Sequence, residues 1–209
     1  MIVIVDYGMG NLRSVSKALE SLGASVRVSS DPRDVAHAAK LILPGVGAFP
    51  AAMRELTARG LTDPLKASVA KGIPYLGICL GLQLLFESSE EGGGAAGLGV
   101  LPGVVKRFAC HSTLKIPHMG WNQIVRHQTL DSRQQAECPL LAGIADGSFT
   151  YFVHSYYVEP TQRSLIALEA DYGGPFAAMV WRGNLFATQF HPEKSQAIGL
   201  QFLKNFLDL

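Results

Sequence analysis

Continuous apolar runs alternate with segments of helical periodicity in the first half of the chain, and this alternation restricts the fold more than any other feature of the sequence. The runs Ile2–Val5 and Leu41–Leu43 are wholly apolar, as expected of strands buried on both faces of a parallel sheet. Segments at about Asn11–Leu22 and Ala51–Arg59 have the spacing of amphipathic helices. Strands and helices in turn predict a mostly parallel sheet with helices on both faces.

The residues between these segments support the same order. Asp31 followed by Pro32 has the pattern of a helix N-cap with proline at the first helical position. Ser25–Val28 alternates as a strand does, and Tyr75–Ile78 is a further apolar run. A helix is predicted directly after that run, over Leu80–Ser88.

The second half of the chain is richer in strands. Gly183 and Asn184 form a hairpin-type turn between two extended segments, and a final helix is predicted over about Gln196–Leu207. The predicted extended segments are Val100–Phe108, Trp121–Arg126, Phe149–Val158, Leu165–Glu169, Phe176–Trp181 and Leu185–Phe190. The expected fold class is therefore α/β, with an open, mostly parallel central sheet, flanking helices and a strand-rich, partly antiparallel C-terminal half. Without an internal repeat or a linker, we expect one domain over residues 1–209.

Charge and cysteine content exclude several classes of function. The chain has 18 basic and 17 acidic residues and no basic run, so neither nucleic acid nor a membrane surface is expected as a partner. Three cysteines, Cys79, Cys110 and Cys138, are odd in number, have no regular spacing and form no CxxC pair, which argues against a disulfide framework and a structural zinc site. No metal and no cofactor are expected. The first apolar run stops at Asp6 and no apolar run reaches about 18 residues. We expect a cytoplasmic protein.

The strongest local signal is Gly77-Ile-Cys79-Leu-Gly81, between an apolar strand and an apolar helix. It has the pattern of a nucleophile elbow, in which the flanking glycines permit a sharp turn that exposes the central side chain. The N-terminus of the helix behind Cys79 favours negative charge and should lower the pKa of the thiol. The alternative is a buried structural cysteine in a tight turn.

A second signal is Gln189-Phe-His191-Pro-Glu193. Pro192 favours an extended backbone at His191, and residues two apart in an extended chain point to the same side. Glu193 is thus expected to bond one nitrogen of His191 while the other faces a nucleophile, as in a catalytic triad. The alternative is a surface turn. Together, the two signals supply Cys79, His191 and Glu193 as a complete triad for acyl transfer through a thioester.

A third signal is the loop Pro44-Gly-Val-Gly47, directly after a predicted strand. Such a loop can present backbone N–H groups to a developing oxyanion, together with the N–H of Leu80. The alternative is an ordinary strand-to-helix turn.

These residues resemble a known family. Gly77-Ile-Cys-Leu-Gly-Leu-Gln83 and His191-Pro-Glu193 are similar to the signatures of class I, triad-type glutamine amidotransferases. More specifically, the chain resembles, nearly end to end, the glutaminase subunits of imidazole glycerol phosphate synthases. The further matching segments are Asp6-Tyr-Gly-Met-Gly-Asn11, Pro44-Gly-Val-Gly-Ala-Phe49, Pro117-His-Met-Gly-Trp-Asn122, Tyr151-Phe-Val-His-Ser-Tyr156 and Gln189-Phe-His-Pro-Glu-Lys-Ser195.

The resemblance implies a role for each matching residue. Cys79 would attack the side-chain amide of glutamine, His191 would transfer protons and Glu193 would orient His191. Val46 and Gly47 would supply the loop half of the oxyanion hole, with Leu80 as the other half. The residues implied in glutamine binding are Gln83, Glu91 through the α-amino group, and the backbone of Ser155 and Tyr156.

The resemblance also implies a partner. Ammonia is mostly protonated in water near neutral pH, so it must reach a second active site while shielded. The implied partner is a (β/α)₈ cyclase subunit in a heterodimer, which would convert the ribulosyl nucleotide PRFAR to imidazole glycerol phosphate and AICAR in histidine biosynthesis. The family positions near that interface match Asn11, Trp121, Tyr151 and Lys194.

Two other interpretations stay open from the sequence. The chain could be the glutaminase subunit of another synthase, of the pyridoxal phosphate or anthranilate type, which shares the triad but should lack Pro117-His-Met-Gly-Trp-Asn122. It could instead be a catalytically silent subunit that docks on a partner.

Overall fold

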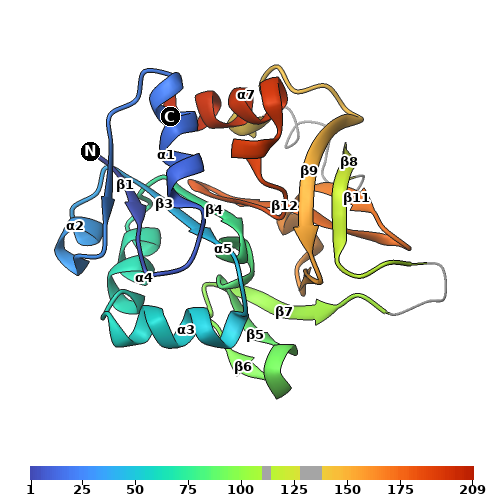
Figure 1. Ribbon diagram of the computed structural model, residues 1–209, viewed down its shortest axis with the longest axis horizontal. Helices are drawn as coiled ribbons and strands as arrows, with labels where there is room; N and C mark the ends of the chain where they lie inside the picture. Colours follow the sequence, from blue (N-terminus) through green and yellow to red (C-terminus); the bar gives the residue numbers. More distant parts are fainter. Residues whose placement is uncertain (110–113, 128–137) are drawn as a thin grey trace.

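The structure, a computed structural model, describes residues 1–109, 114–127 and 138–209 of the chain (Figure 1). Its main element is a nine-stranded sheet. In order across the sheet, the strands are β2 (Val26–Ser29), β1 (Ile2–Val5), β3 (Lys40–Gly45), β4 (Tyr75–Cys79), β13 (Leu185–Thr188), β12 (Pro175–Arg182), β11 (Ile166–Asp171), β8 (His118–Arg126) and β9 (Ser148–His154).

The pairing of these strands changes direction partway across the sheet. From β2 to β13 every neighbouring pair is parallel, whereas from β13 to β9 every pair is antiparallel. The change occurs at the turn between Arg182 and Leu185, which are paired in register, as the Gly183-Asn184 signal predicted. A parallel sheet with an antiparallel C-terminal half is therefore confirmed.

Helices cover both faces of the parallel part. On one side lie α1 (Leu12–Ser21) and α7 (Gln196–Leu207), and on the other lie α2 (Pro32–Ala36), α3 (Phe49–Ala58) and α4 (Thr62–Ala70) (Figure 1). Side chains of β1 alternate between the two cores, since Val3 and Val5 pack on the α3 side and Ile4 packs on the α1 side. Burial of each such side chain contributes about 1.5–3 kcal/mol. The helices on both faces therefore bury the side chains of β1, which pairs with β2 and β3 at its two edges.

One of these helices, α4, had no counterpart in the sequence prediction. Its buried residues are Leu65 and Ser68, so it has little of the apolar periodicity by which an amphipathic helix is recognised. By contrast, α2 begins where Asp31 and Pro32 predicted, with the Asp31 carboxylate accepting from the backbone N–H of Arg33.

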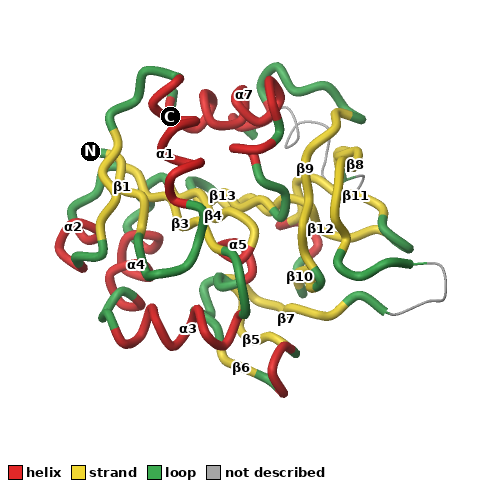
Figure 2. Tube along the Cα trace, viewed as in Figure 1, coloured by secondary structure: helices red, strands yellow, loops and turns green. Residues whose placement is uncertain are grey.

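A second, four-stranded sheet lies beside the first, as the tube in Figure 2 shows. Its strands are, in order, β10 (Tyr156–Pro160), β7 (Leu101–Arg107), β5 (Phe86–Ser89) and β6 (Ala95–Ala96). The helix predicted over Leu80–Ser88 is wrong in its length, because α5 covers Leu80–Gln83 and β5 follows. The carbonyls of residues 84, 85 and 86 accept from the N–H groups of residues 98, 100 and 99 rather than continuing a helix.

The single extended segment predicted over Phe149–Val158 is also wrong. Strand β9 ends at His154 in the large sheet, and β10 begins at Tyr156 in the small one. Between them, the carbonyl of Ser155 accepts from Phe108 N at 3.1 Å, so the chain crosses from one sheet to the other at that residue. This crossing puts Ser155 and Tyr156 beside the end of β4.

The remaining elements are short. They are the 3-10 helices η1 (Glu91–Gly93), η2 (Pro139–Leu141), η3 (Arg163–Leu165) and η4 (Pro192–Lys194). None of the helices in the described part of the chain is both long and apolar enough to span a membrane.

Candidate active site

The sharp turn between β4 and α5 holds Cys79 in a backbone conformation that side chains rarely adopt. Its φ is 55°, a left-handed value that costs about 1–3 kcal/mol for a residue other than glycine. A Cβ on Gly81 would lie 1.8 Å from the carbonyl oxygen of Leu43, and one on Gly77 would lie 2.7 Å from the carbonyl oxygen of Gly81. The turn therefore requires glycine on both sides of the cysteine.

His191 and Glu193 follow β13, the strand beside β4. The Nδ1 atom of His191 lies 2.8 Å from Oε1 of Glu193, and both side chains are almost fully buried. Since a carboxylate accepts, Nδ1 carries the proton. Nε2 is buried without a hydrogen-bond partner among the described residues, and Cys79 is near enough to act on the pKa of the ring.

Opposing effects act on the pKa of His191. Burial lowers it, but the charge of Cys79 and a side-chain hydrogen bond to it, followed by the same two contributions from Glu193, raise the pKa to about 10. The charged imidazolium is thus favoured when Cys79 is a thiolate. The arrangement places an imidazole that can take up and release a proton beside a nucleophilic sulfur.

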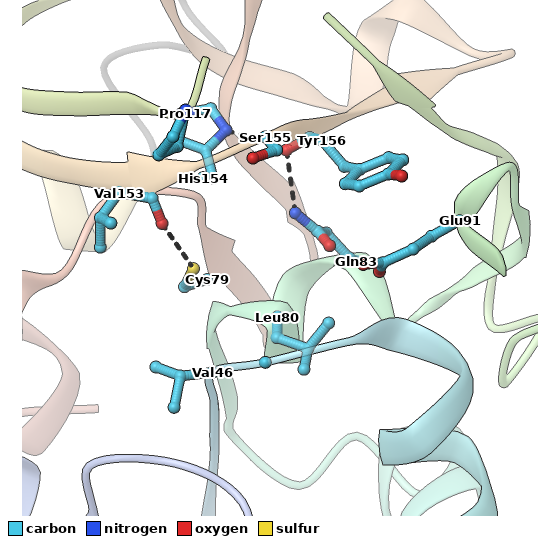
Figure 3. Close-up of a pocket in the computed structure, with 11 residues that line it drawn as sticks. Val46, Cys79, Leu80, Gln83, Glu91, Pro117, Val153, His154, Ser155 and Tyr156 are labelled. Atoms are coloured by element: carbon cyan, nitrogen blue, oxygen red, sulfur yellow. Dashed lines mark hydrogen bonds between the residues drawn. The ribbon is translucent and has the colours of Figure 1, made fainter.

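Cys79 opens onto a cavity of about 360 Å³ (Figure 3). Residues 153–156 lie across this cavity from Val46 and Leu80. Its walls include every residue that the sequence suggested for an oxyanion hole or for substrate binding, namely Val46, Gly47, Leu80, Gln83, Glu91, Ser155 and Tyr156. Segments far apart in the chain thus meet at the cysteine.

The loop after β3 passes directly beside the cysteine. Gly45 is the register partner of Cys79, and the next two residues, Val46 and Gly47, line the cavity. Gly47 has a φ of 106°, and a Cβ there would lie 2.7 Å from the end of the Met9 side chain. Strand β3 extends through Pro44 and Gly45, so the loop is shorter than the sequence predicted.

Two polar side chains on the cavity wall are held in place by backbone groups. Oε2 of Glu91 accepts from the N–H of Phe49 at 2.7 Å, which leaves its other oxygen for a ligand. Nε2 of Gln83 donates to the carbonyl of Tyr156 at 3.0 Å and to Oε1 of Gln189 at 3.2 Å. The amide nitrogen of Gln83 is therefore engaged within the protein, and its oxygen is the atom left for a ligand.

Three of the residues suggested for a partner interface lie together at the β8–β9 edge of the sheet, Trp121 on β8, Tyr151 on β9 and Lys194 on the adjoining η4. Trp121 is 47% exposed, is the register partner of Tyr151, and its ring lies 6.0 Å from the Tyr151 ring. Nζ of Lys194 lies 5.8 Å from the Tyr151 ring centroid. The side chain of Asn11 accepts from Ser14 N as the N-cap of α1, and its predicted place at an interface stays a prediction.

The same strand face carries exposed apolar residues that the sequence analysis did not single out. Met119 pairs with Val153, and Phe149 pairs with Gln123. Both Met119 and Phe149 are more than half exposed. We call the set Met119, Trp121, Phe149, Tyr151 and Lys194 the edge patch.

Two histidines beside the cavity, His118 and His154, were given no role from the sequence. Nδ1 of His154 donates to the carbonyl of Tyr156 at 2.8 Å, so its Nε2 is the acceptor for Nδ1–H of His118 at 2.9 Å. Burial lowers the pKa of His118 to about 4 and that of His154 to about 3. Both are thus neutral structural histidines near neutral pH. Their motifs were visible in the sequence, but their pairing across β8 and β9 was not.

The other cysteines differ from Cys79. Cys138 is a buried free thiol, and burial raises its pKa to about 12, so it remains protonated and unreactive near neutral pH. Cys110 lies outside the described residues. Within the described ranges, the His, Cys, Asp and Glu side chains form no group able to hold a metal ion.

Comparison with known proteins agrees with this geometry. Residues 3–209 match the family model described as glutamine amidotransferase class-I. The chain is 55% identical to the imidazole glycerol phosphate synthase subunit HisH of Syntrophotalea carbinolica, over all of both chains. It is 52% identical to the HisH subunit of Rhodopirellula baltica, over 99% of this chain and 96% of that one.

Solved structures share the fold at lower identity. One described as a glutamine amidotransferase superposes with a TM-score of 0.74 at 19% identity, covering 100% of this chain and 98% of that one. PurLQS from Thermotoga maritima superposes with a TM-score of 0.69 at 19% identity, covering 99% and 97%. Because the family model matches residues 3–209, almost the whole chain, the chain belongs to the class-I glutamine amidotransferase family.

Proposed function

We propose that this chain, as a single domain of residues 1–209, is the glutaminase subunit of an imidazole glycerol phosphate synthase and acts in histidine biosynthesis. The observation that carries the proposal is the position of Cys79, at the tip of a glycine-flanked turn and near enough to the buried His191–Glu193 pair to act on the pKa of His191. Relatives at 55% and 52% identity, named as HisH subunits of that synthase, support the pathway.

The proposed chemistry begins with the Cys79–His191 ion pair. The thiolate of Cys79 attacks the side-chain carbonyl carbon of glutamine. The C–N bond then breaks, the leaving nitrogen takes the Nε2 proton of His191, and a γ-glutamyl thioester and ammonia remain. Neutral His191 next removes a proton from water, whose oxygen attacks the thioester. Glutamate leaves and the thiolate–imidazolium pair is restored, with Glu193 keeping the proton on Nδ1 throughout.

Backbone N–H groups near Cys79 are proposed to stabilise the oxyanion of each tetrahedral intermediate. The donors are the N–H of Leu80, at the start of α5, and an N–H of the loop at Val46 and Gly47. Each such donor contributes about 2.7–4 kcal/mol to transition-state stabilisation. Because Val46 lies in a partly exposed loop rather than in β3, we propose that a partner aligns its N–H and thereby activates the enzyme.

The cavity walls suggest how glutamine is held. The other carboxylate oxygen of Glu91, Oε1, is proposed to bind the α-amino group of glutamine, because a carboxylate is the natural partner of an ammonium cation. The crossing at Ser155 and Tyr156 offers backbone groups to the α-carboxylate. The oxygen of Gln83, whose nitrogen is occupied, can accept from an N–H of the substrate.

The proposed partner is a (β/α)₈ cyclase subunit that receives ammonia and converts PRFAR. The edge patch, continuous through β9 with the cavity residue Val153, is where we propose that it docks. Cys79 must stay a free thiol for this chemistry, which fits a reducing cytoplasm.

Replacing Trp121 in the edge patch should weaken the complex with the cyclase. We expect Trp121→Ala to raise the Kd about 10- to 100-fold, because exposed tryptophans at an interface centre commonly contribute most of the binding energy. Val28→Ala is the matched control, since Val28 is 42% exposed on β2 at the opposite edge of the sheet. Titration calorimetry measures both, and equal affinities for the two variants would contradict docking at this edge.

Removing the charge of Glu193 should shift the pH dependence of turnover. Glu193 helps to raise the folded-state pKa of His191 to about 10, so the imidazolium that protonates the leaving nitrogen persists until the pH approaches that value. In Glu193→Gln the pKa falls, and the alkaline limb of kcat moves toward neutral pH. The control is Glu20→Gln, which makes the same change at an exposed position on α1. A pH profile of kcat that is identical in Glu193→Gln and wild type would contradict the role of Glu193.

The pathway itself is tested with the assembled synthase. Purified with a cyclase subunit, the chain should support glutamine-dependent conversion of PRFAR, and added ammonium salt at high pH should bypass it. Activation instead by a pyridoxal phosphate or anthranilate-type synthase would keep the family and overturn the pathway.

A further inference from the structure

Gln189 is a fully buried side chain that connects the nucleophile to the substrate pocket. It lies two residues before His191, immediately after β13, and its backbone N–H donates to Ala178 O at 2.8 Å. Its Nε2 lies 3.6 Å from Sγ of Cys79, and its Oε1 accepts from Nε2 of Gln83 at 3.2 Å. Neither the triad nor the glutamine-binding residues proposed above include it.

Hydrogen bonds join the carbonyl of Tyr156 to Gln83, Gln83 to Gln189, and Gln189 to Cys79. The Tyr156 carbonyl at one end of this series determines the orientation of the Gln189 amide. The carbonyl oxygen of Tyr156 can only accept, so Gln83 must turn its NH₂ group toward it. The second N–H of that NH₂ group reaches Gln189, which must present its oxygen in return. The NH₂ group of Gln189 is thereby directed at the sulfur of Cys79.

The sulfur therefore has different partners in its two protonation states. As a thiol, Cys79 can donate to the carbonyl of Val153, whose oxygen lies 3.9 Å away (Figure 3). As a thiolate it can only accept, and the N–H of Gln189 is then a matched donor. A hydrogen bond to the charged form favours that form.

We propose that Gln189 is a catalytic residue that stabilises the Cys79 thiolate by donating a hydrogen bond to Sγ, with its amide held in the donating orientation by Gln83 and the Tyr156 carbonyl. The use of this thiolate in glutamine hydrolysis rests on the function proposed above. The contact also holds the sulfur while the thioester forms and breaks. Among the described residues, two other ionisable groups are coupled to Cys79. The charge of Cys79 helps to raise the pKa of His191. The pKa of Tyr7 is raised mainly by burial and further by the charge of Cys79.

The test measures the reactivity of Cys79 without glutamine. In the full-length chain, the rate of iodoacetamide alkylation at Cys79 is followed as a function of pH by mass spectrometry of the peptide that carries it, because the thiolate is the reacting form. In Gln189→Met, which keeps the length but removes the donor, we expect the alkylation midpoint to rise. Alkylation below that midpoint should slow about tenfold. Gln189→Glu brings a negative charge toward the sulfur and should raise the midpoint further.

The control is Thr188→Val, which removes the hydrogen bond from the adjacent buried hydroxyl to Phe190 O at 3.0 Å but leaves the sulfur untouched. Its alkylation profile should match that of the wild type. The proposal is supported if the alkylation midpoint rises from wild type to Gln189→Met and again to Gln189→Glu. A non-specific disturbance of the site would not produce this order. Circular dichroism identifies folded variants, and the Gln189→Glu comparison stands by itself if Gln189→Met does not fold.

An unchanged midpoint in a folded Gln189→Met or Gln189→Glu would overturn the proposal. Because the assay uses no glutamine and no cyclase, this outcome is separate from failure of the proposed function. If wild type lacked glutaminase activity even with the cyclase and its nucleotide ligand present, while the midpoints still shifted in the expected order, the hydrogen bond would stand and the proposed function would fall.

Discussion

Cys79→Ala is expected to lower glutamine hydrolysis by at least about 10³-fold, as loss of a covalent nucleophile does in other triad enzymes. The fold should persist, because alanine fills nearly the same space and the left-handed φ of 55° at this position already carries a Cβ. In the complex with a cyclase, conversion of PRFAR supported by added ammonia should be retained. Assays with glutamine and with ammonium salt, run on the same preparation, separate the two activities.

Cys138→Ala is the matched control for this variant. Cys138 is also a buried free cysteine, but burial raises its pKa to about 12, so it supplies no thiolate near neutral pH. Its replacement should leave glutamine hydrolysis unchanged. If Cys79→Ala retained glutamine-dependent turnover, the chain would be a docking subunit without chemistry of its own, and the proposed mechanism would be wrong.

Gly81→Ala is expected to produce the largest loss of stability of any conservative change at the site. The added Cβ would lie 1.8 Å from the carbonyl oxygen of Leu43. Gly81 is buried in α5 and Leu43 is buried in β3, so neither residue can easily move away. Relief requires β3 and α5 to separate, which costs more than the roughly 1–3 kcal/mol of ordinary overpacking. Urea unfolding, or failure to purify folded protein, measures the effect.

Gly23→Ala provides the comparison, since it makes the same chemical change in open space. Gly23 follows α1 with a φ of 84°, and a Cβ there would meet no atom within 4 Å. Its cost is limited to the left-handed backbone, about 1–2 kcal/mol. Equal stabilities for Gly81→Ala and Gly23→Ala would contradict the close approach of β3 and α5.

The parts of the fold that local sequence determines were predictable. The runs at Ile2–Val5 and Tyr75–Ile78 became parallel strands, and the final helix has the predicted bounds Gln196–Leu207. The two glycines around Cys79 indicated the sharp turn because their requirement is local and steric. Each of these features depends on neighbouring residues and on a short repeat of apolar positions.

The features that depend on contacts distant in sequence were not predictable in the same way. Strand β5 replaces the second half of the predicted helix because the carbonyls of residues 84–86 accept from the N–H groups of residues 98–100. The break at Ser155 likewise depends on Phe108, which directly follows β7 of the small sheet and donates to the Ser155 carbonyl. The direction of the Gln189 amide depends on the carbonyl of Tyr156, which no local pattern reveals.

The measurement that tests the central claim most directly is the rate of glutamine hydrolysis by the wild type and by Cys79→Ser, each with and without the cyclase subunit and its nucleotide ligand. The account predicts a low rate for the isolated wild type, strong activation when cyclase and ligand are present, and no activation of Cys79→Ser. A high rate in the isolated wild type, unaffected by the cyclase, would contradict both the proposed partner and the proposed control by the loop at Val46.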